Sequence, residues 1–444
     1  MKPPPTRRTF LTQSSAITSS LLLGNSLVGR STNPHALASG NGQGRAAGNE
    51  ELRVALIGCG GRGAGAAHQA LSTKGNVRLV AMADAFSDRL EGTLNWLAEN
   101  HVEQVDVPEE RRFVGFDAYQ KAIDCGVDVV VLATPPGFRP IHFEYAIQQD
   151  KHVFMEKPVA VDGPGVRRVL AAAAIAKTKA LKVGVGLQRH HQAPYLELIR
   201  RIRAGEIGKI NLLRCYWNSA GVWVRERQPD WNEMTYQMRN WYYFNWLCGD
   251  HITEQHIHNL DVCNWVMNDF PAKAHGQGGR QVRTGLDHGE IFDHHMIEFT
   301  YPDGTKMFSQ CRHIPDTRSE VNEHAHGSLG TVNFGRSSIE FSNGERWRFV
   351  DEYKDPYQVE HDELFAAIRS GAAFNEADYG AKSTLTSILG RMASYSGKEV
   401  SWEQALNSEL DLSPTAYAWD AEPSSLPDEN GRYLVPVPGV TVAF

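Results

Sequence analysis

The first half of the chain combines short apolar runs with longer stretches in which apolar residues recur every three or four positions. The short runs predict buried strands and cover residues 52–57, 77–83, 127–133, 151–155 and 181–186. The longer stretches predict helices at residues 64–71, 86–99, 140–149 and 163–178. Strands that alternate with helices form parallel, doubly wound sheets, so we expect an α/β fold with this arrangement.

Beyond residue 190 the pattern changes. A helix predicted at residues 195–204 precedes segments in which apolar and polar residues alternate, at 210–217, 294–301, 305–312 and 331–334. Alternation predicts strands with one buried and one exposed face, as in a large, mainly antiparallel open sheet covered by helices on one side. Further helices are expected at residues 359–369 and 381–396. The segment 410–444 contains several prolines and is expected to be an extended tail.

The length of 444 residues is too great for one ordinary domain. The change of pattern places a parallel-sheet domain at residues 51–186 and a second α/β domain at residues 187–409. A linker rich in Gly, Asn and Ala is expected at residues 39–50.

The first 38 residues indicate an export signal, which is excluded from the fold. Residues 6–11 contain the pair Arg7-Arg8, a mildly apolar stretch follows at 16–28, and residues 36–38 (Ala-Leu-Ala) offer a cleavage site. This order is typical of a twin-arginine signal, so we expect a periplasmic or otherwise exported protein that folds in the cytoplasm. A disordered basic tail with a chance arginine pair is the alternative.

Composition excludes several classes of protein. A net charge of -7 argues against a nucleic-acid partner. The six scattered cysteines include no C-x-x-C pair, which argues against a zinc ribbon or a disulfide scaffold. No stretch reaches the roughly 20 apolar residues of a membrane-spanning helix, so no membrane span is expected in the mature chain.

Residues 58–63, Gly-Cys-Gly-Gly-Arg-Gly, form a G-x-G-x-x-G pattern between a predicted strand and a predicted helix. In that context the glycines allow a tight turn, a close approach to a pyrophosphate and close helix packing. Asp84 ends the second strand, where a carboxylate binds a ribose 2′-hydroxyl and repels a 2′-phosphate. We expect a dinucleotide, NAD rather than NADP, bound by Gly58, Gly60, Gly61, Arg62, Gly63 and Asp84.

Two further strand ends carry candidate residues. Thr134 and Pro135 follow the strand at 127–133, and Glu156, Lys157 and Pro158 follow the strand at 151–155. The carboxyl ends of parallel strands bind ligands, so Thr134, Pro135, Glu156 and Lys157 are predicted to join the cofactor site. A lysine there can stabilise an alkoxide, which makes Lys157 a catalytic candidate. A solvated surface lysine is the alternative.

A polar stripe is predicted on a helix over residues 249–261. Asp250, Glu254, His258 and Asp261 are spaced by four, four and three, which predicts one shared face. Carboxylates beside an imidazole suit general acid/base work, with His258 as base and Glu254 as its support. No metal is expected, because His256 and His258 would point about 200° apart on a helix. A solvated polar helix face is also consistent with the pattern.

Together these motifs resemble the glucose–fructose oxidoreductase / inositol dehydrogenase / MocA (Gfo/Idh/MocA) family over about residues 52–400. The resemblance implies a Rossmann domain followed by an α/β domain whose open sheet carries the sugar site and often the oligomer contact. It also implies a carbohydrate or cyclitol ligand and a homo-oligomer, a dimer or tetramer. His258 and Asp261 match the family's Asp-x-x-x-His-x-x-Asp motif, whereas Glu254 replaces its first Asp.

The resemblance also indicates substrate-binding residues. Gln188 and Arg189 follow the strand at 181–186, where the family often has a polar residue before an arginine. With Trp217 and Asp261 they are predicted to bind the substrate. Aromatic and basic side chains suited to sugars gather between residues 195 and 241, namely Tyr195, Trp217, Trp223, Arg225, Tyr236 and Trp241. His324 and His326 are further candidates, with a role in a turn as the alternative.

The resemblance and the export signal together predict an NAD-dependent enzyme that acts on a sugar or glycoside. Because no pool of free NAD is evident outside the cytoplasm, we expect the cofactor to be retained and recycled. Glycoside cleavage by oxidation, elimination and hydrolysis, and oxidoreduction between two sugars, both meet this condition. An NAD(P)-dependent sugar or cyclitol dehydrogenase and a non-catalytic carbohydrate-binding protein are the alternatives.

Overall fold

The carboxyl ends of a parallel sheet form the crevice in which the candidate site lies. The computed structural model describes residues 50–444, so the predicted export signal and linker residues 39–49 lie outside the described part. The first sheet has the strand order β3-β2-β1-β4-β5-β6, with all pairs parallel. The order reverses between β1 and β4, which places the ligand crevice outside these two strand ends. The strands are β1 (Leu52–Ile57), β2 (Val77–Asp84), β3 (Arg112–Val114), β4 (Val129–Leu132), β5 (His152–Met155) and β6 (Val183–Val185).

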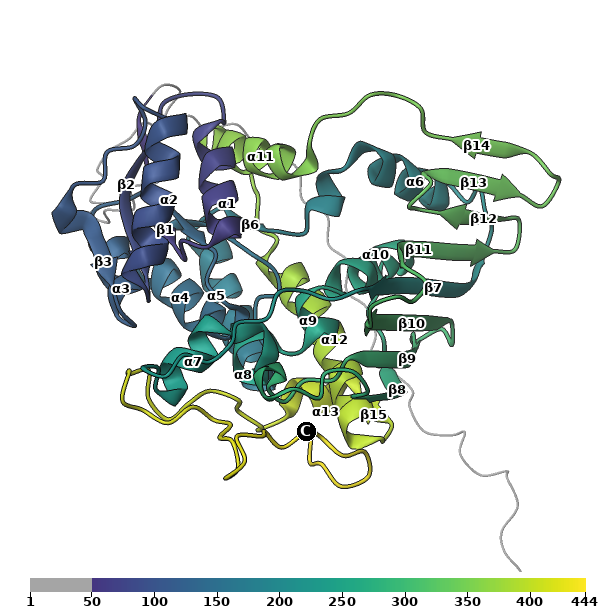
Figure 1. Cartoon of the computed structure of the whole chain (residues 1–444). Helices are drawn as coiled ribbons and strands as arrows, with labels where there is room; N and C mark the ends of the chain where they lie inside the picture. The colour runs from purple at the N-terminus through teal and green to yellow at the C-terminus, as the bar shows by residue number, and fades with distance from the viewer. Residues whose placement is uncertain (1–49) are drawn as a thin grey trace, which may run out of the picture. The chain divides into compact units, whose positions relative to one another are not determined.

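Helices cover both faces of this sheet (Figure 1). Alternate residues of β1 enter two different clusters of buried apolar side chains, because successive side chains of a strand point to opposite faces. One cluster lies under α1 and α2 and the other under α3, α4 and α5. The predicted doubly wound sheet is therefore confirmed. The helices are α1 (Gly61–Leu71), α2 (Ser87–Asn100), α3 (Ala118–Asp124), α4 (Arg139–Gln148) and α5 (Gly163–Thr178).

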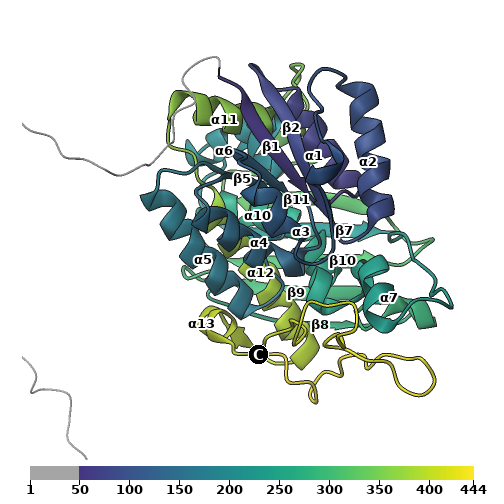
Figure 2. The same cartoon turned by 90° about the vertical axis from the view of Figure 1, so that its left-hand side faces the viewer.

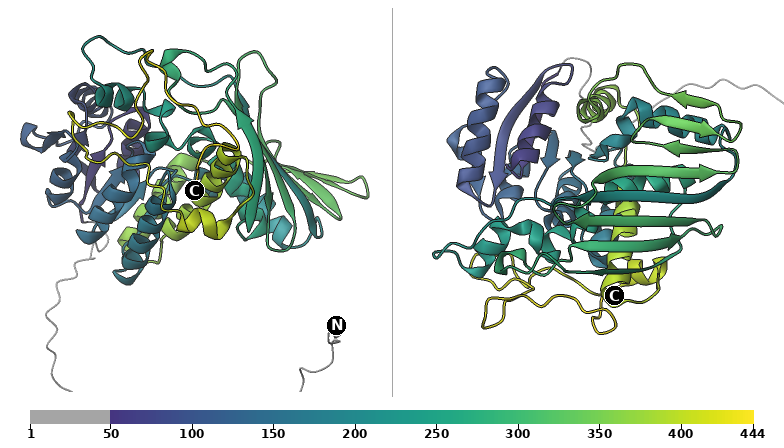
Figure 3. Two further views of the ribbon diagram at one scale, coloured as in Figure 1. Left: turned by 90° about the horizontal axis from the view of Figure 1, so that it is seen from below. Right: turned by 45° about the vertical axis from the view of Figure 1, so that its right-hand side comes forward.

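The second sheet has nine strands in the order β14-β13-β12-β11-β7-β10-β9-β8-β15. Strands β7 and β10 pair in parallel and all other pairs are antiparallel, which confirms the predicted mainly antiparallel sheet. Figure 3 shows it as a broad open sheet. The strands are β7 (Ile210–Ser219), β8 (Lys273–Gly279), β9 (His294–Thr300), β10 (Lys306–His313), β11 (Glu320–Gly327), β12 (Gly330–Asn333), β13 (Ser338–Phe341), β14 (Arg346–Arg348) and β15 (Val400–Ser401).

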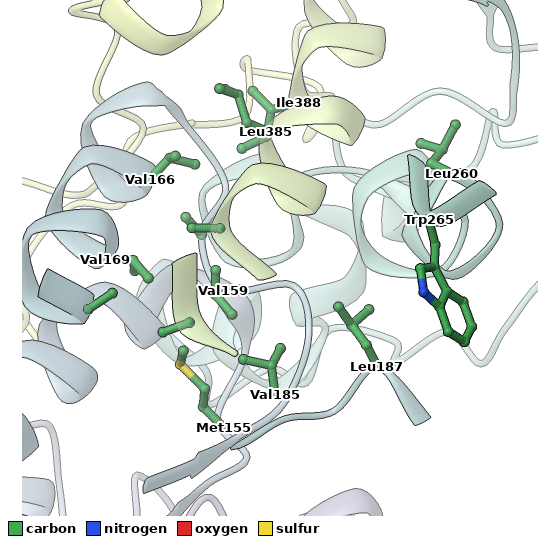
Figure 4. Packing of buried hydrophobic residues seen from close by; sticks show 14 of the residues in the cluster. Met155, Val159, Val166, Val169, Val185, Leu187, Leu260, Trp265, Leu385 and Ile388 are labelled. Atoms are coloured by element: carbon green, nitrogen blue, oxygen red, sulfur yellow. The ribbon is translucent and has the colours of Figure 1, made fainter. Parts of the chain in front are cut away.

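One long helix joins the two halves into a single core. Helix α12 is buried along nearly its whole length and contains many small residues, which allow close packing. Figure 4 shows Leu385 and Ile388 of α12 near Val166 and Val169 of α5. The helices of the second half are α6 (Ala193–Arg203), α7 (Glu233–Arg239), α8 (Asn245–Cys248), α9 (His251–Glu254), α10 (Ile257–Met267), α11 (Pro356–Ser370), α12 (Ala377–Ser396) and α13 (Trp402–Asn407).

The chain returns to the first sheet after the second one is complete. Helix α11 packs on α1, where Gln358 Nε2 donates a hydrogen bond of 3.0 Å to the Gln69 carbonyl. Residues 410–444 form no helix or strand, as the prolines predicted, and run beside α7 (Figure 2). Within residues 50–444, no helix combines the length and apolar character that crossing a bilayer requires.

Candidate active site

The glycine loop after β1 is shaped by two close backbone approaches. Gly58 has a φ of 94°, in the left-handed region, and a Cβ there would lie 2.5 Å from the Thr134 nitrogen. A Cβ on Gly63 would lie 1.9 Å from the Gly58 carbonyl oxygen. Any larger residue at either position must push the strand, the loop and α1 apart. The sequence interpretation of the first and third glycines is therefore supported by geometry.

The remaining two glycines border open space. Among residues 50–444, no heavy atom lies within 4 Å of a Cβ built on Gly60 or Gly61. Both glycines line a cavity of about 450 Å³ at the start of α1, where unpaired backbone N–H groups favour a phosphate. This space fits the pyrophosphate of a dinucleotide. Eight of the residues predicted to bind the cofactor line this cavity: Gly58, Gly60, Gly61, Arg62, Gly63, Asp84, Thr134 and Pro135.

The open space at Gly60 leads to a prediction. Gly60 has a φ of -78°, which alanine adopts readily, so Gly60→Ala should leave the melting temperature unchanged. Its methyl group would enter the space that a pyrophosphate needs, so the dissociation constant for NAD should rise about tenfold or more. Calorimetric titration and a thermal melt measure both quantities. An unchanged NAD affinity would show that the phosphates do not approach Gly60.

Asp84, at the end of β2, is bonded to the glycine loop. Its carboxylate accepts hydrogen bonds from the backbone nitrogens of Cys59 at 2.6 Å and of Phe86 at 2.9 Å. Burial raises its pKa. The two backbone bonds fix the carboxylate at the wall of the cavity, where it can accept a hydrogen bond from a ribose hydroxyl.

Arg62 and Glu156 connect the glycine loop to the end of β5. The Arg62 guanidinium donates to the Glu156 carboxylate and to Gln69 Oε1 at 2.9 Å, and it lies over the Tyr357 ring. Burial disfavours the charged form of Glu156, yet Arg62 and Lys157 hold its pKa below the usual range. Arg62 therefore lines the cavity with its charge already paired. Glu156 fixes the position of the Arg62 guanidinium.

The predicted continuous helix over residues 249–261 is wrong. The segment forms two helices, α9 and α10, separated at Gln255 and His256. In a continuous helix the Glu254 carbonyl would accept from the His258 nitrogen. Here the His258 nitrogen bonds to the Gln255 carbonyl at 3.3 Å instead. The break frees the Glu254 carbonyl and turns the predicted stripe of four polar residues in separate directions.

Lys157 donates a hydrogen bond to the Glu254 carbonyl that the break leaves free. Its Nζ donates to the Glu254 carbonyl at 2.6 Å and to Glu254 Oε1 at 3.1 Å. Both side chains are nearly buried, with exposed fractions of 13% and 14%. An ammonium group has three protons, and two of them are used here. The third remains to donate to a substrate oxygen.

His258 lies in the first turn of α10, next to this pair. Its ring is nearly parallel to the Trp217 indole on β7, with the centroids 6.1 Å apart. Its Nδ1 is buried and has no hydrogen-bond partner within residues 50–444. Burial, together with the positive charges of Lys157, Arg189 and Arg62, holds the pKa of His258 well below its ordinary value. The imidazole is therefore neutral near pH 7 and able to accept a proton.

The depressed pKa of His258 sets the expected pH profile. A base must be deprotonated to work, so its acid limb follows its folded-state pKa, which lies below the ordinary value of about 6.5. The kcat/KM of the enzyme should stay constant as the pH falls from about 8 to about 6.5 and should decline only below that range. Initial rates of sugar oxidation in constant-ionic-strength buffers test this. An acid limb centred at or above pH 6.5 contradicts the assignment of a buried His258 base.

Two of the predicted substrate residues are engaged with other side chains. The buried Arg189 guanidinium pairs with Glu323, which also accepts from Tyr195 at 3.1 Å and from Asn259. Asp261 accepts from His190 at 2.8 Å and from Ser383 at 2.6 Å. Through Asn259 and Asp261, these contacts join α10 to β11 and α12. Glu323 and Asn259 were missed in the sequence, because a buried carboxylate within an alternating strand gives no signal of its own.

The other two substrate candidates differ in their surroundings. Trp217 faces His258, as described above, and gives the site an apolar surface. The buried Gln188 Oε1 has no hydrogen-bond partner among the described residues. Trp217 lies on β7, and Gln188 begins the turn Gln188–His191 that follows β6.

The aromatic residues predicted to contact a sugar are distributed differently. Trp223, Arg225 and Trp241 line the cavity at the glycine loop. The Tyr195 and Tyr236 hydroxyls are buried and bond to Glu323 and Asp287. The wider set therefore belongs to the nucleotide cavity and the core.

The structure also shows where the remaining histidine candidates lie. On β11, His324 lies between the inward-facing Glu323 and Ala325, and His326 directly follows Ala325, so both histidines point to the other face of the sheet. His256 bonds to Ser309 at 2.7 Å and to Asn259 at 3.2 Å. Its nitrogens therefore do not share a ligand with His258.

Asp250 anchors the start of α9. Its carboxylate accepts from the His251 nitrogen at 2.5 Å, from the Phe292 nitrogen at 3.0 Å and from the Tyr395 hydroxyl at 2.5 Å. His295 lies 3.3 Å away. Asp250, His251 and His295 are close enough to hold a metal ion, but the carboxylate is already bonded on both oxygens. We assign this cluster to positioning α9, which carries Glu254.

A Rossmann sheet, a glycine loop that fits a pyrophosphate and a lysine–histidine pair define an NAD-dependent oxidoreductase. Residues 52–187 match the family described as "Oxidoreductase family, NAD-binding Rossmann fold", and residues 195–333 match the "GFO/IDH/MocA C-terminal domain". The chain therefore belongs to the Gfo/Idh/MocA family of oxidoreductases, and its cofactor is NAD.

Curated relatives and solved structures agree with this family. The chain is 26% identical over 335 residues to an inositol 2-dehydrogenase of Rhizobium meliloti, covering 72% of this chain and 90% of the relative. It is 27% identical to an inositol 2-dehydrogenase of Burkholderia vietnamiensis, covering 72% and 87%. An aldose-aldose oxidoreductase of Caulobacter crescentus has a TM-score of 0.62 at 18% identity, covering 79% of this chain and 100% of that one. A scyllo-inositol dehydrogenase of Lactobacillus casei with bound NAD(H) and scyllo-inositol has a TM-score of 0.61 at 17% identity, covering 80% and 99%. The two structures share the fold of this chain.

Proposed function

We propose that this chain is an exported enzyme that oxidises a hydroxyl group of a sugar, glycoside or cyclitol ring with an NAD that stays bound and is restored within each turnover. The observation that carries the proposal is the meeting of Lys157, Glu254 and His258 beside the glycine loop. Lys157 is held by Glu254, and His258 lies close enough to Lys157 and Arg62 for both charges to lower its pKa.

Each of these residues has a defined task in the oxidation of a hydroxyl group. The neutral His258 accepts the hydroxyl proton. The free proton of the Lys157 ammonium donates to the same oxygen and stabilises the negative charge that develops there. Glu254 holds Lys157 through its carbonyl and its carboxylate. NAD, when bound by the glycine loop and Asp84, supplies the acceptor for the hydrogen on the same carbon.

A polyhydroxylated ring is the substrate class that we favour. The curated relatives are named inositol 2-dehydrogenases, and the fold neighbours include an aldose-aldose oxidoreductase and a scyllo-inositol dehydrogenase. Trp217 supplies an apolar surface next to the proposed base, and the C–H face of a sugar or cyclitol ring packs well against an indole. Charged substrates are less suited, since Lys157 and Arg189 are already paired.

The proposed retention of NAD follows from the predicted export. A protein that crosses the membrane folded can carry a cofactor, and outside the cytoplasm it would have no evident supply of a second one. The bound NAD then returns to its starting oxidation state in each turnover, and the net reaction consumes none. We propose glycoside cleavage through transient oxidation, or transfer of reducing equivalents between two sugars, ahead of a simple inositol dehydrogenase.

The proposal is tested by turnover without added nucleotide. Purified protein is incubated in D2O with glycosides, aldoses and inositols, and products are identified by NMR. We expect many turnovers per chain with no added NAD. Deuterium next to the oxidised carbon would identify the elimination route, and paired lactone and alditol would identify the sugar–sugar route. Product limited to one equivalent per chain until NAD is added would contradict retention, and no product under either condition would contradict catalysis.

A further inference from the structure

Residues from three distant parts of the chain surround the nucleotide cavity. Residues 57–89, which include the glycine loop and the end of β2, and residues 115–142 form one wall, and residues 222–241, between β7 and α8, supply Trp223, Arg225, Met238, Arg239 and Trp241 to the other. We propose that residues 222–241, held in place by the tail residues 417–419 and together with them called the clasp, close over the adenosine half of NAD and keep it from leaving. This inference deepens the proposed function and rests on it for the identity of the bound nucleotide.

Arg239 fastens the first part of the clasp to the nucleotide domain. Its guanidinium donates two hydrogen bonds to the Asp88 carboxylate, at 2.8 and 2.7 Å, and lies 3.7 Å above the Phe86 ring. Phe86 and Asp88 follow Asp84, the residue that faces the ribose, by two and four positions. The bridge therefore crosses the cavity next to the adenosine half of the dinucleotide, rather than next to Lys157 and His258.

The tail residues 417–419 form the second part of the clasp and pack on the nucleotide domain. The Trp419 ring lies 5.2 Å from the Phe86 ring and 4.7 Å from the Phe116 ring, centroid to centroid. The Tyr417 ring lies 5.4 Å from the Phe138 ring. The tail, drawn in yellow, runs below α7 and α8 (Figure 1). It thus binds residues 85–138 of the nucleotide domain as well as the segment around α7.

The two parts of the clasp are also joined to each other. Asn232 Nδ2 donates to the Trp419 carbonyl at 2.6 Å, and Gln237 Nε2 donates to the Ser425 carbonyl at 2.6 Å. The apolar side chains of the clasp form one cluster with Phe86, Phe116 and Phe138. Neither part can move away from the cavity without breaking contacts to the other. In this proposal the clasp opens as a unit before a nucleotide enters or leaves.

A segment that covers the nucleotide and a side chain that only contacts it affect the rates of nucleotide binding and release differently. A side chain that only touches the nucleotide slows its dissociation and leaves association unchanged. A cover that must open slows both steps, because entry and exit pass the same barrier. The ratio of the two rate constants then changes much less than either one. This difference allows the role of Arg239 as a fastener to be separated from any contact that it makes with the nucleotide.

The experiment measures nucleotide exchange on the full-length chain. Exchange of bound NAD for deuterium-labelled NAD, followed by mass spectrometry, gives the dissociation rate constant. Binding of NADH to protein stripped with charcoal, followed by energy transfer from tryptophan, gives the association rate constant. For Arg239→Ala we expect both rate constants to rise about tenfold, since an ion pair and a guanidinium–aromatic contact are lost. Trp419→Ala should have the same sign, and Asp88→Asn a smaller effect.

Arg201→Ala is the matched control. Arg201 pairs with Glu197 and Glu206, both at 2.8 Å, and lies 4.0 Å from the Trp347 ring, so it makes the same kinds of contact far from the cavity. Its exposed fraction of 22% is close to the 20% of Arg239. This variant should leave both rate constants unchanged. If Arg239→Ala is not folded, Asp88→Asn and Trp419→Ala carry the test.

The outcomes separate the clasp from the proposed function. A rise in the dissociation rate constant alone, or no change in either constant, would overturn the clasp, even in a protein that turns over without added NAD. Slow exchange in the wild-type chain, accelerated in both directions by Arg239→Ala, supports the clasp. If such a protein shows no turnover on any sugar, the proposed function fails and the clasp stands.

Discussion

His258→Ala is expected to lower the turnover number by about 10²–10⁴-fold while the nucleotide stays bound, because the variant lacks the base that accepts the hydroxyl proton. The buried Nδ1 of His258 has no hydrogen-bond partner in the described part of the chain, so its removal leaves no polar group there without one. The variant should therefore fold normally. Turnover, NAD content and melting temperature measured on the same preparation separate chemistry from binding and stability.

Lys157→Met provides the companion variant. Methionine keeps the apolar length of the side chain but loses the charge, so the oxygen of the substrate is no longer stabilised. We expect a loss of about 10²–10³-fold in kcat, as for the removal of one strong donor at a developing oxyanion. Since Lys157 and His258 act on the same oxygen, the double variant should lose less than the product of the two single losses.

His326→Ala serves as a control for both variants. His326 bonds to Arg214 at 3.0 Å on the outer face of the second sheet, so its removal should leave turnover unchanged. Full activity in His258→Ala or in Lys157→Met would show that the catalytic assignment is wrong. A loss of bound NAD in either variant would instead place that residue in cofactor binding.

Gly63→Ala is expected to have the largest structural effect of any single methyl group in the glycine loop. Its Cβ would lie 1.9 Å from the Gly58 carbonyl oxygen and 3.0 Å from the Gly58 carbonyl carbon. Both are backbone atoms and cannot rotate away, so α1 must move off β1. We expect the free energy of unfolding to fall by about 3 kcal/mol. NAD binding should be lost as well, because the displaced α1 no longer presents its N–H groups to the phosphates.

Gly92→Ala is the matched control for this substitution. Gly92 lies within α2 and has no heavy atom within 4 Å of a Cβ built on it. The variant should gain about 0.5–1 kcal/mol of stability from the better helix propensity of alanine. Denaturant unfolding and NAD titration measure both variants. Normal stability and NAD affinity in Gly63→Ala would contradict the close packing of α1 on β1.

The nucleotide half of the molecule could be predicted from the sequence because its signals are local. Strands β1, β2 and β5 are buried on both faces, so each appears as an apolar run whose ends match the predictions within one residue. The glycine pattern fixes the loop between β1 and α1. Strand β3 is short, partly exposed and polar at its start, so it left no apolar run to recognise.

The catalytic segment could be predicted only in part. Residues 250–261 contain no proline or internal glycine, so nothing in the local sequence indicates a break between α9 and α10. The break is stabilised by Lys157, which lies 97 residues away and bonds to the freed Glu254 carbonyl. The sequence therefore singled out Glu254, His258 and Lys157, but it predicted that Glu254 supports His258, whereas in the structure Glu254 bonds to Lys157.

The position of the aromatic segment could not be predicted from the sequence for a related reason. Trp223, Arg225 and Trp241 have the composition of a sugar site, and composition does not show which cavity a loop faces. Their place over the glycine loop depends on contacts with Phe86, Asp88 and the tail, which are far apart in the sequence. Long-range packing of this kind leaves no periodic signal in one chain.

The nucleotide content of the purified protein tests most directly the central claim, that NAD is retained and restored in each turnover. Full-length protein is dialysed at length, denatured, and its released nucleotide identified and counted by mass spectrometry. We predict about one NAD, oxidised or reduced, per chain, as expected when dissociation is slow compared with dialysis. Recovery of protein that is free of nucleotide yet folded and active only with added NAD would contradict the claim. Recovery of NADP would contradict the role of Asp84.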